Sequence, residues 1–166
     1  LLIILSFFLV LQSCKQANAS ATAKTEMQEL TATKAVVQAR FQDLNGNPIQ
    51  LSDYQGKRIV LNYWATWCGP CIQEMPSMER AQQLLGEENY LFLLASDQSL
   101  EKIKAFTKKK NFDLFFVKFN GALAEEQIYA LPATFIYNSE GEKVERIDGA
   151  TEWDAPEIIQ KLKAIQ

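Results

Sequence analysis

From position 36 onward, short runs of apolar residues alternate with segments in which apolar residues recur at helical spacing. This alternation is typical of an α/β domain, in which helices cover a central sheet. Strands are predicted at 36–41, 49–51, 58–65, 90–95, 115–119, 133–138 and 143–147. Helices are predicted at 70–86, 99–110, 123–129 and from 154 or 155 onward. No internal repeat is visible, so we expect one domain with a mixed sheet.

Turn residues predict a β-hairpin at each end of this domain. Asn45-Gly46 favours a tight turn between the first two strands, and Ser139-Glu140-Gly141 favours one between the last two. Strand 115–119 is predicted to lie at an edge of the sheet. In the C-terminal helix, the spacing of the apolar residues predicts an inward face made of Ile158, Ile159, Leu162 and Ile165.

The chain opens with an uncharged apolar run, Leu1–Leu11. This run has the length of the apolar part of a signal peptide and is too short to span a membrane as a helix. Because no Met or basic segment precedes it, we expect the natural signal peptide to begin upstream. The run ends in Leu11-Gln12-Ser13-Cys14, which resembles the lipobox of bacterial lipoproteins, although Gln12 is larger than the usual residue. The resemblance implies that Cys14 is acylated.

The apolar run and the cysteine that follows it set the expected organisation of the chain. Residues 1–13 would be a signal peptide, 14–34 the lipidated cysteine with a tether, and 35–166 the folded domain. Residues 15–33 lack aromatic side chains and a sustained apolar face, so they cannot bury enough surface to offset the entropy of ordering. The alternatives are a buried N-terminal helix, or a plain secretory signal with a coincidental cysteine.

Composition excludes several kinds of function. Among 166 residues, 17 basic and 20 acidic side chains give a net charge of −3, so nucleic acid is not an expected partner. The basic run Lys108–Lys110 ends a predicted helix, where a solvated cation is favourable. Histidine is absent, which excludes Ser-His-Asp and Cys-His catalysis and attachment of haem through Cys-x-x-Cys-His. Three cysteines alone do not complete a zinc site, and we expect no metal and no cofactor.

Two of the three cysteines form the pattern Cys68-Gly69-Pro70-Cys71, between a predicted buried strand and a predicted helix. At the N-terminus of a helix, unpaired N–H groups stabilise a thiolate and lower the pKa of Cys68. Cys71 lies three residues later on the same helix face, where it can attack a mixed disulfide on Cys68. Pro70 is compatible with the first helical turn. A purely stabilising disulfide is the alternative, but so short a loop restricts the unfolded chain very little.

The segments 62–71 (NYWATWCGPC), 71–76 (CIQEMP) and 131–135 (LPATF) resemble the thioredoxin superfamily, and more narrowly the TlpA/ResA-like thiol-disulfide oxidoreductases that bacteria tether outside the cytoplasmic membrane. The resemblance spans residues 36–165. It implies a thioredoxin-like α/β fold, with a mixed central sheet flanked by helices and an N-terminal β-hairpin extension.

The resemblance also implies roles for single residues. Cys68 would be the nucleophile, Cys71 the resolving thiol, and Pro132 a cis proline that faces the disulfide. An ordinary turn before a strand is the alternative for Pro132. The residues expected to contact substrate are Trp67, Gly69, Pro70 and Leu131, whereas Trp64 is expected in the core.

Asn62 departs from thioredoxin proper, which carries a buried Asp at this position that helps to move the proton of the resolving cysteine. An Asn side chain cannot titrate. Glu74, one helical turn past Cys71, is the available substitute, and the resemblance implies that it tunes the cysteine pKa values. If Glu74 is partly buried, its own pKa rises. The alternative is an exposed Glu that only favours the helix dipole.

These observations predict an exported, lipid-anchored thiol-disulfide oxidoreductase in the bacterial cell envelope, facing the periplasm. The Gly-Pro pair between the cysteines favours reduction of protein disulfides, which requires an electron donor in the membrane. By resemblance, the substrates are apocytochrome c thiols, as in cytochrome c maturation, or oxidised envelope proteins. We expect a monomer.

Three other functions are the alternatives. The first is an oxidant or isomerase. The second is a binding module with an inert disulfide, which the intact Cys68, Cys71 and Pro132 disfavour. The third is a peroxiredoxin, whose Pro-x-x-x-Thr-x-x-Cys pattern would need Pro at Leu61 and Thr at Ala65.

Overall fold

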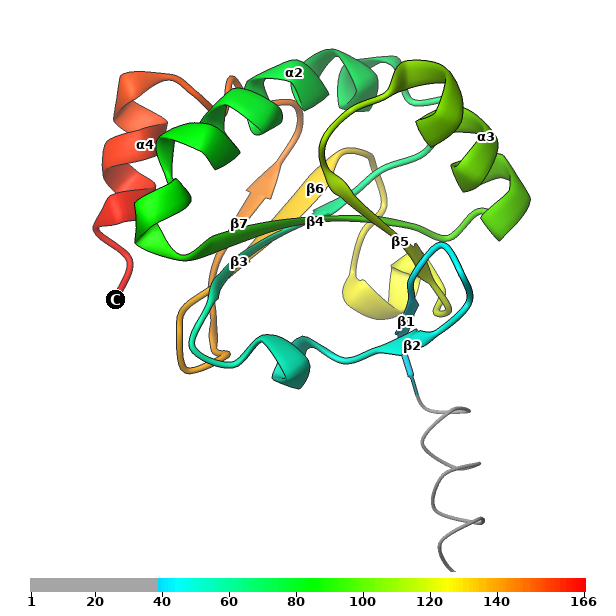
Figure 1. The fold of residues 1–166 in the computed structure, drawn as a ribbon, viewed down its shortest axis with the longest axis horizontal. Helices are drawn as coiled ribbons and strands as arrows, with labels where there is room; N and C mark the ends of the chain where they lie inside the picture. Colours follow the sequence, from blue (N-terminus) through cyan, green and yellow to red (C-terminus); the bar gives the residue numbers. More distant parts are fainter. Residues whose placement is uncertain (1–38) are drawn as a thin grey trace, which may run out of the picture. The chain divides into compact units, whose positions relative to one another are not determined.

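A computed structural model of the chain describes residues 39–166 (Figure 1). Its strands are β1 (Phe41–Gln42), β2 (Pro48–Ile49), β3 (Arg58–Tyr63), β4 (Tyr90–Ser96), β5 (Phe115–Phe119), β6 (Ala133–Tyr137) and β7 (Lys143–Asp148). Its α-helices are α2 (Gly69–Leu84), α3 (Leu100–Lys110) and α4 (Pro156–Lys163), with 3-10 helices η1 (Leu51–Tyr54), η2 (Gly86–Glu88) and η3 (Leu123–Glu126). The predicted signal peptide, Cys14 and the tether lie outside the described residues, as do residues 36–38 of the first predicted strand.

The strands form one mixed sheet in the order β2-β1-β5-β4-β3-β6-β7. The three central strands β3, β4 and β5 run parallel, and the outer pairings are antiparallel. Parallel neighbours need crossover connections, and α2 and α3 supply them. In the register of the sheet, Tyr63 at the end of β3 pairs with Ala133 at the start of β6. The segments that follow β3 and precede β6 therefore meet at one edge of the sheet.

The prediction that 115–119 lies at an edge of the sheet is wrong. β5 pairs with β4 on one side and with β1 on the other, and β2 and β7 are the edges. The reason is the N-terminal hairpin, which adds its two strands beyond β5. The predicted turn in this hairpin is present: Gly46 has a φ of +89°, and the Asp43 side chain accepts the N–H groups of Asn45 and Asn47.

Other predicted elements are present with shifted ends. The predicted strand 49–51 ends at Ile49, because Leu51 begins η1. The predicted helix 123–129 is only one 3-10 turn, η3. In α4, Leu162 is buried, and Ile158, Ile159 and Ile165 pack partly buried against the same cluster, as the helical spacing predicts. Among residues 39–166 no helix has both the length and the apolar character to cross a membrane.

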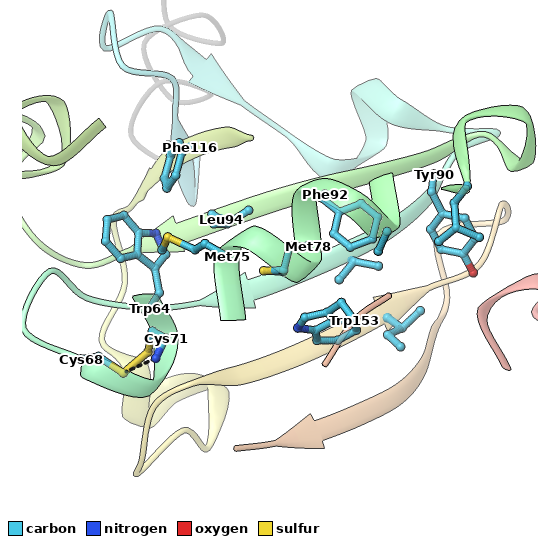
Figure 2. Close-up of a cluster of buried hydrophobic side chains, with 14 of the residues drawn as sticks. Trp64, Cys68, Cys71, Met75, Met78, Tyr90, Phe92, Leu94, Phe116 and Trp153 are labelled. Atoms are coloured by element: carbon cyan, nitrogen blue, oxygen red, sulfur yellow. Dashed lines mark hydrogen bonds between the residues drawn. A yellow bond between two sulfur atoms is a disulfide. The ribbon is translucent and has the colours of Figure 1, made fainter. Parts of the chain in front are cut away.

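The helices α2, α3 and α4 cover one face of the sheet, and η1 and η3 lie on the other (Figure 1). Beneath the helices is an apolar cluster to which α2 contributes Cys71, Met75, Met78 and Ala81. Figure 2 shows the two cysteines at one end of this cluster, close to Trp64. Trp64 is buried, as expected, and its ring lies 4.7 Å from that of Phe106 and 5.3 Å from that of Phe116. Aromatic packing therefore anchors the start of the segment that leads from β3 to the cysteines.

A substitution at Met78 should show how much the packing of α2 contributes to stability, because it leaves both cysteines in place. Its side chain is fully buried in the cluster, so Met78→Ala leaves a cavity and should lower the free energy of unfolding by about 2–5 kcal/mol. Leu84 in the same helix is 57% exposed, and Leu84→Ala should change the free energy of unfolding by no more than about 0.5 kcal/mol. Urea unfolding of both variants measures the difference. Equal losses would contradict the position of α2 over the sheet.

Candidate active site

The two cysteines lie where β3 passes into α2. Cys68 is the N-cap residue of the helix, and Cys71 lies in its first turn. Their sulfur atoms form a disulfide, with the Cα atoms 5.3 Å apart. Pro70 in the first turn loses no helical hydrogen bond, because the N–H groups there have no partner within the helix. The strand, the turn and the helix therefore place both sulfur atoms at the end of a rigid element.

The helix N-terminus contacts Cys68 directly. The N–H of Cys71 donates to the Sγ of Cys68 at 3.3 Å, which is the dashed line in Figure 2. The same N–H and the positive end of the helix dipole would stabilise a thiolate on Cys68 after reduction. Both cysteines are buried, but Cys68 retains 4% exposure whereas Cys71 has none. A substrate would therefore reach Cys68 first.

Pro132 comes to the same edge of the sheet from the other side. The Leu131–Pro132 peptide bond is cis, the conformation that the resemblance implies. Pro132 precedes Ala133, which pairs with Tyr63 just before the cysteine segment. Its carbonyl accepts the N–H of Gly149 at 2.9 Å, so the loop after β7 closes against it. Leu131 is half-buried and packs against the apolar clusters on both faces of the sheet.

The surface around the disulfide exposes uncharged residues. Trp67 is 73% exposed next to the buried Cys68, and Gly69 and Pro70 are exposed beyond it. Trp64, three residues earlier, is buried, so the two tryptophans are separated as the sequence predicts. This arrangement places Trp67 where an approaching chain would touch it.

Glu74 is buried, not exposed on the helix surface, so the alternative of a solvated helix-start residue is wrong. Its Oε1 accepts the side-chain N–H of Asn62 at 2.8 Å. Its Oε2 accepts the backbone N–H of Thr151 and the indole N–H of Trp153, both at 3.0 Å. The carboxyl group thus joins the cysteine helix to β3 and to the loop before α4.

Burial raises the pKa of Glu74 above its ordinary value. The bonds from Thr151, Trp153 and Asn62 act in the opposite direction, because they stabilise the charged form, but the effect of burial is larger. A carboxyl group with a raised pKa, one helical turn from Cys71, has the properties of a proton donor or acceptor for that thiol.

Asn62 takes a bridging role that its position in the sequence does not reveal. Its side-chain nitrogen donates to Glu74 and also, at 3.0 Å, to the hydroxyl of Thr134 on β6. Its Oδ1 is buried and has no hydrogen-bond partner among residues 39–166. Asn62 therefore connects the cis-proline strand with Glu74 through two donated bonds.

Sequence reasoning missed three members of this network: Thr134, Thr151 and Trp153. Trp153 is fully buried, and its backbone N–H also donates to the Ser77 hydroxyl on α2 at 3.0 Å. The available signal was a lone tryptophan in the otherwise polar segment 148–155, where an exposed indole would be costly. Within residues 39–166 no cluster of three or more His, Cys, Asp or Glu side chains has the arrangement of a metal site.

Comparisons with known proteins agree with this geometry. Residues 24–146 match the model of the AhpC/TSA family. The chain is 30% identical over 124 residues to the thiol-disulfide oxidoreductase ResA of Bacillus thuringiensis subsp. konkukian, with 72% of each chain covered. It is 33% identical over 104 residues to the thioredoxin-like protein YneN of Bacillus subtilis, covering 59% of this chain and 60% of YneN.

Solved structures share the fold. The pneumococcal exposed lipoprotein thioredoxin from Streptococcus pneumoniae is 26% identical with a TM-score of 0.64, and the match covers 75% of this chain and 97% of that one. A thiol:disulfide interchange protein of the thioredoxin family from Chlorobium tepidum has a TM-score of 0.60 at 20% identity, over 74% and 91% of the two chains. The sheet with its three helices and the added β1 and β2 is thus a thioredoxin-like fold.

The raised pKa of Glu74 predicts a pH dependence of stability. The folded state holds this proton more tightly than the unfolded state, so wild-type stability falls as the pH rises from the unfolded pKa through the raised folded pKa. Glu74→Gln removes this titration, so the variant should gain stability relative to the wild type as the pH rises. Urea unfolding over roughly pH 4 to 9 measures the difference.

The Gln variant should fold, because its oxygen can accept from Thr151 and Trp153 while its NH₂ faces Asn62, whose unpartnered Oδ1 can turn to accept it. Glu74→Ala is the control. It also lacks the titration, but it leaves the buried donors of Asn62 and Trp153 without their acceptor, at about 1–3 kcal/mol each, and the part-buried N–H of Thr151 as well. As the pH changes, the free energy of unfolding of Glu74→Ala should change in parallel with that of Glu74→Gln and should be lower at every pH. A Gln variant that parallels the wild type would contradict the raised pKa.

Proposed function

The chain belongs to the AhpC/TSA family and is a ResA-like thiol-disulfide oxidoreductase with a Cys68–Cys71 pair; on this premise we propose that it reduces disulfides in proteins of the bacterial cell envelope. The observation that carries the proposal is the disulfide at the N-terminus of α2, with Gly-Pro between the cysteines and only Cys68 near the surface.

The reaction proceeds in two exchanges. The Cys68 thiolate attacks one sulfur of a substrate disulfide, forms a mixed disulfide and expels the other substrate sulfur as a thiolate. The Cys71 thiolate then attacks the Cys68 sulfur, closes the Cys68–Cys71 disulfide and releases the second substrate thiolate. The substrate gains two electrons and two protons, and the protein loses them.

Glu74 is proposed to take part in the second exchange. Cys71 is fully buried, so its thiol proton has no direct access to water when the thiolate must form. Glu74 lies one turn further along α2, and burial raises its pKa toward the range in which it can accept and return a proton. In this proposal Glu74 tunes the cysteine pKa values in place of the buried Asp of thioredoxin.

Substrate contact is assigned to the uncharged surface around the disulfide: Trp67, Gly69, Pro70 and Leu131. Pro132, which is buried, is assigned a catalytic role. The exposure of Trp67 and the meeting of the segments after β3 and before β6 support this assignment. The cis proline leaves a neighbouring backbone edge free for an extended substrate chain and keeps metal ions away from the two thiols. The substrates are proteins with oxidised cysteines, among them apocytochrome c.

The direction of transfer follows from the dipeptide between the cysteines. Gly-Pro is the pair found in reducing thioredoxins, whose potential is about −270 mV, against about −120 mV for the strong oxidant DsbA. In an oxidising envelope such a pair must be reduced again after each turnover. The proposal therefore includes an electron donor in the membrane that converts the Cys68–Cys71 disulfide back to two thiols.

Attachment to the membrane is the last part of the proposal. Residues 1–13 act as a signal peptide, Cys14 carries the lipid, 14–34 form a tether and 35–166 form the catalytic domain, which faces the periplasm as a monomer. The lipobox-like Leu11–Cys14 supports this organisation. Further support comes from the exposed lipoprotein thioredoxin of Streptococcus pneumoniae among the similar structures.

Cys71→Ser should trap the reaction at its first stage. The variant keeps the attacking thiol but cannot resolve the mixed disulfide, so it should accumulate a covalent complex with a disulfide-bonded model substrate such as insulin. With Cys14 also replaced by Ser in both variants, Cys68→Ser should form no such complex, because the one remaining cysteine, Cys71, is fully buried. Non-reducing gels read both outcomes. A complex formed equally well by the Cys68 variant would contradict the assigned nucleophile.

The equilibrium potential of the Cys68–Cys71 pair tests the direction. We expect a value near the thioredoxin figure of about −270 mV, measured against dithiothreitol or glutathione buffers by mass spectrometry after alkylation. A value near about −120 mV would make the protein an oxidant or isomerase and overturn the proposed reduction.

Cys14→Ser tests the anchor. The lipid chain is attached through the Cys14 sulfur, so the variant should move from the membrane fraction to the soluble periplasmic fraction. The thiol-disulfide exchange by Cys68 should be unaffected. A variant that stays in the membrane fraction would argue that something other than Cys14 holds the chain there.

A further inference from the structure

The segment between β3 and α2 carries the proposed nucleophile, Cys68, yet its backbone makes few hydrogen bonds. Beyond the last β3–β4 pair, Tyr63 with Ala95, the N–H of Trp64 still donates to the carbonyl of Ala95 at 3.0 Å. The N–H of Cys68 donates to Ala65, within the same segment. Between these two anchors, the N–H of Thr66 has, within the described part of the chain, a side-chain acceptor and no backbone acceptor.

That acceptor is Gln98. Its Oε1 accepts the N–H of Thr66 at 2.7 Å, and its Nε2 donates to the Thr66 hydroxyl at 3.1 Å. One amide side chain, from a position 32 residues later in the chain, thus holds both the backbone N–H and the hydroxyl of Thr66. Because the backbone N–H can only donate, the orientation of the Gln98 amide is fixed. The side chain continues the contact between the two segments after the backbone ladder has ended.

The two hydrogen bonds between Gln98 and Thr66, which we call the Gln98 clamp, matter because of the position of Thr66. Thr66 is two residues before Cys68, and the residue between them, Trp67, is 73% exposed and adds little packing. Cys68 must lie at the helix N-terminus for the Cys71 N–H to reach its sulfur. Movement of Thr66 would therefore carry both the sulfur and the exposed indole with it.

We propose that Gln98 is a positioning residue for Cys68: its clamp on Thr66 holds the Cys68 sulfur against the first turn of α2. Gln98 acts through Thr66 and touches neither the disulfide nor the substrate. The inference rests on the proposed role of Cys68 as the attacking thiol. It adds to that role a residue from the loop after β4, a part of the chain that the Cys-x-x-Cys pattern does not include.

The test is the pH dependence of Cys68 alkylation in the reduced full chain. The probe is iodoacetamide, a neutral reagent, and mass spectrometry of the Cys68 peptide separates this thiol from Cys14 and Cys71. In Gln98→Ala the sulfur loses its fixed place at the helix, so the midpoint should rise by about half a pH unit or more toward the free-thiol value of about 8.5. The control Gln82→Ala removes a similar side-chain bond, from Gln82 to the Asp113 carbonyl at 3.1 Å. Its midpoint should equal that of the wild type.

A positioning role has a signature that general loosening lacks. A thiolate of higher pKa is intrinsically more nucleophilic, so the Gln98→Ala curve should lie below the wild type near neutral pH and above it at the alkaline plateau. An unchanged midpoint, or a rate lowered equally at every pH, would overturn the inference.

Two further variants keep the test decisive if Gln98→Ala does not fold. Thr66→Val retains the N–H bond but loses the hydroxyl bond, so it should give a smaller shift in the same direction. Gln98→Glu can accept both the N–H and the O–H of Thr66, and its added charge is screened by salt. Its midpoint should return to the wild-type value at about 1 M salt, whereas that of the Ala variant should not. A wild-type midpoint in Thr66→Val, or no return in Gln98→Glu, would overturn the inference.

The outcome is separable from that of the proposed function. The wild-type potential decides whether the pair reduces or oxidises substrates, and the Cys71→Ser trap decides which thiol attacks. The shift of the Cys68 midpoint in Gln98→Ala depends on neither result, because the thiol titrates in the same way whichever direction electrons flow.

Discussion

The buried carboxyl group of Glu74 is the interaction on which the arrangement of the active-site end depends. A carboxylate taken out of water is costly unless donors replace the lost hydration. Here Asn62 on β3, Thr151 in the loop before α4 and Trp153 in the same loop supply three donors. Each comes from a different part of the chain than α2. The helix that carries both cysteines can therefore occupy only the position in which all three bonds form.

The same network connects the two sides of the site. Asn62 donates to Glu74 and to Thr134, two residues after the cis proline. The loop that holds Glu74 also closes on Pro132, through the bond from Gly149 to the Pro132 carbonyl. The cysteine helix and the proline strand are thus held by one set of hydrogen bonds. A change in the protonation of Glu74 acts on both, because its charge is what the Asn62 amide and the two N–H groups of the loop stabilise.

Local patterns in the sequence account for the parts of the site that depend on neighbouring residues. Periodicity and helix capping account for β3, for the cysteines at a helix start and for the buried Trp64, since these signals act over a few positions. The predicted strand 58–65 nevertheless ends at Tyr63. The family resemblance added the cis bond at Pro132. Contacts between distant segments could not be predicted in this way. The interior place of β5 depends on the pairing of Phe41 with Phe119, and no local pattern at 115–119 announces it.

The asymmetry between the two cysteines explains why distant segments are needed at all. Both sulfur atoms lie at the first turn of one helix, so the differences in their burial and in their neighbours depend on the segments packed around that turn. Cys68 lies at the rim, where the Cys71 N–H and the segment held by Gln98 act on its sulfur. Cys71 is fully buried, one turn from a carboxyl group whose pKa is raised by burial. In the proposed reaction this difference sets the order of events. The Cys68 thiolate attacks first, and the fully buried Cys71 thiol reacts only after it has passed its proton to the buried network around Glu74.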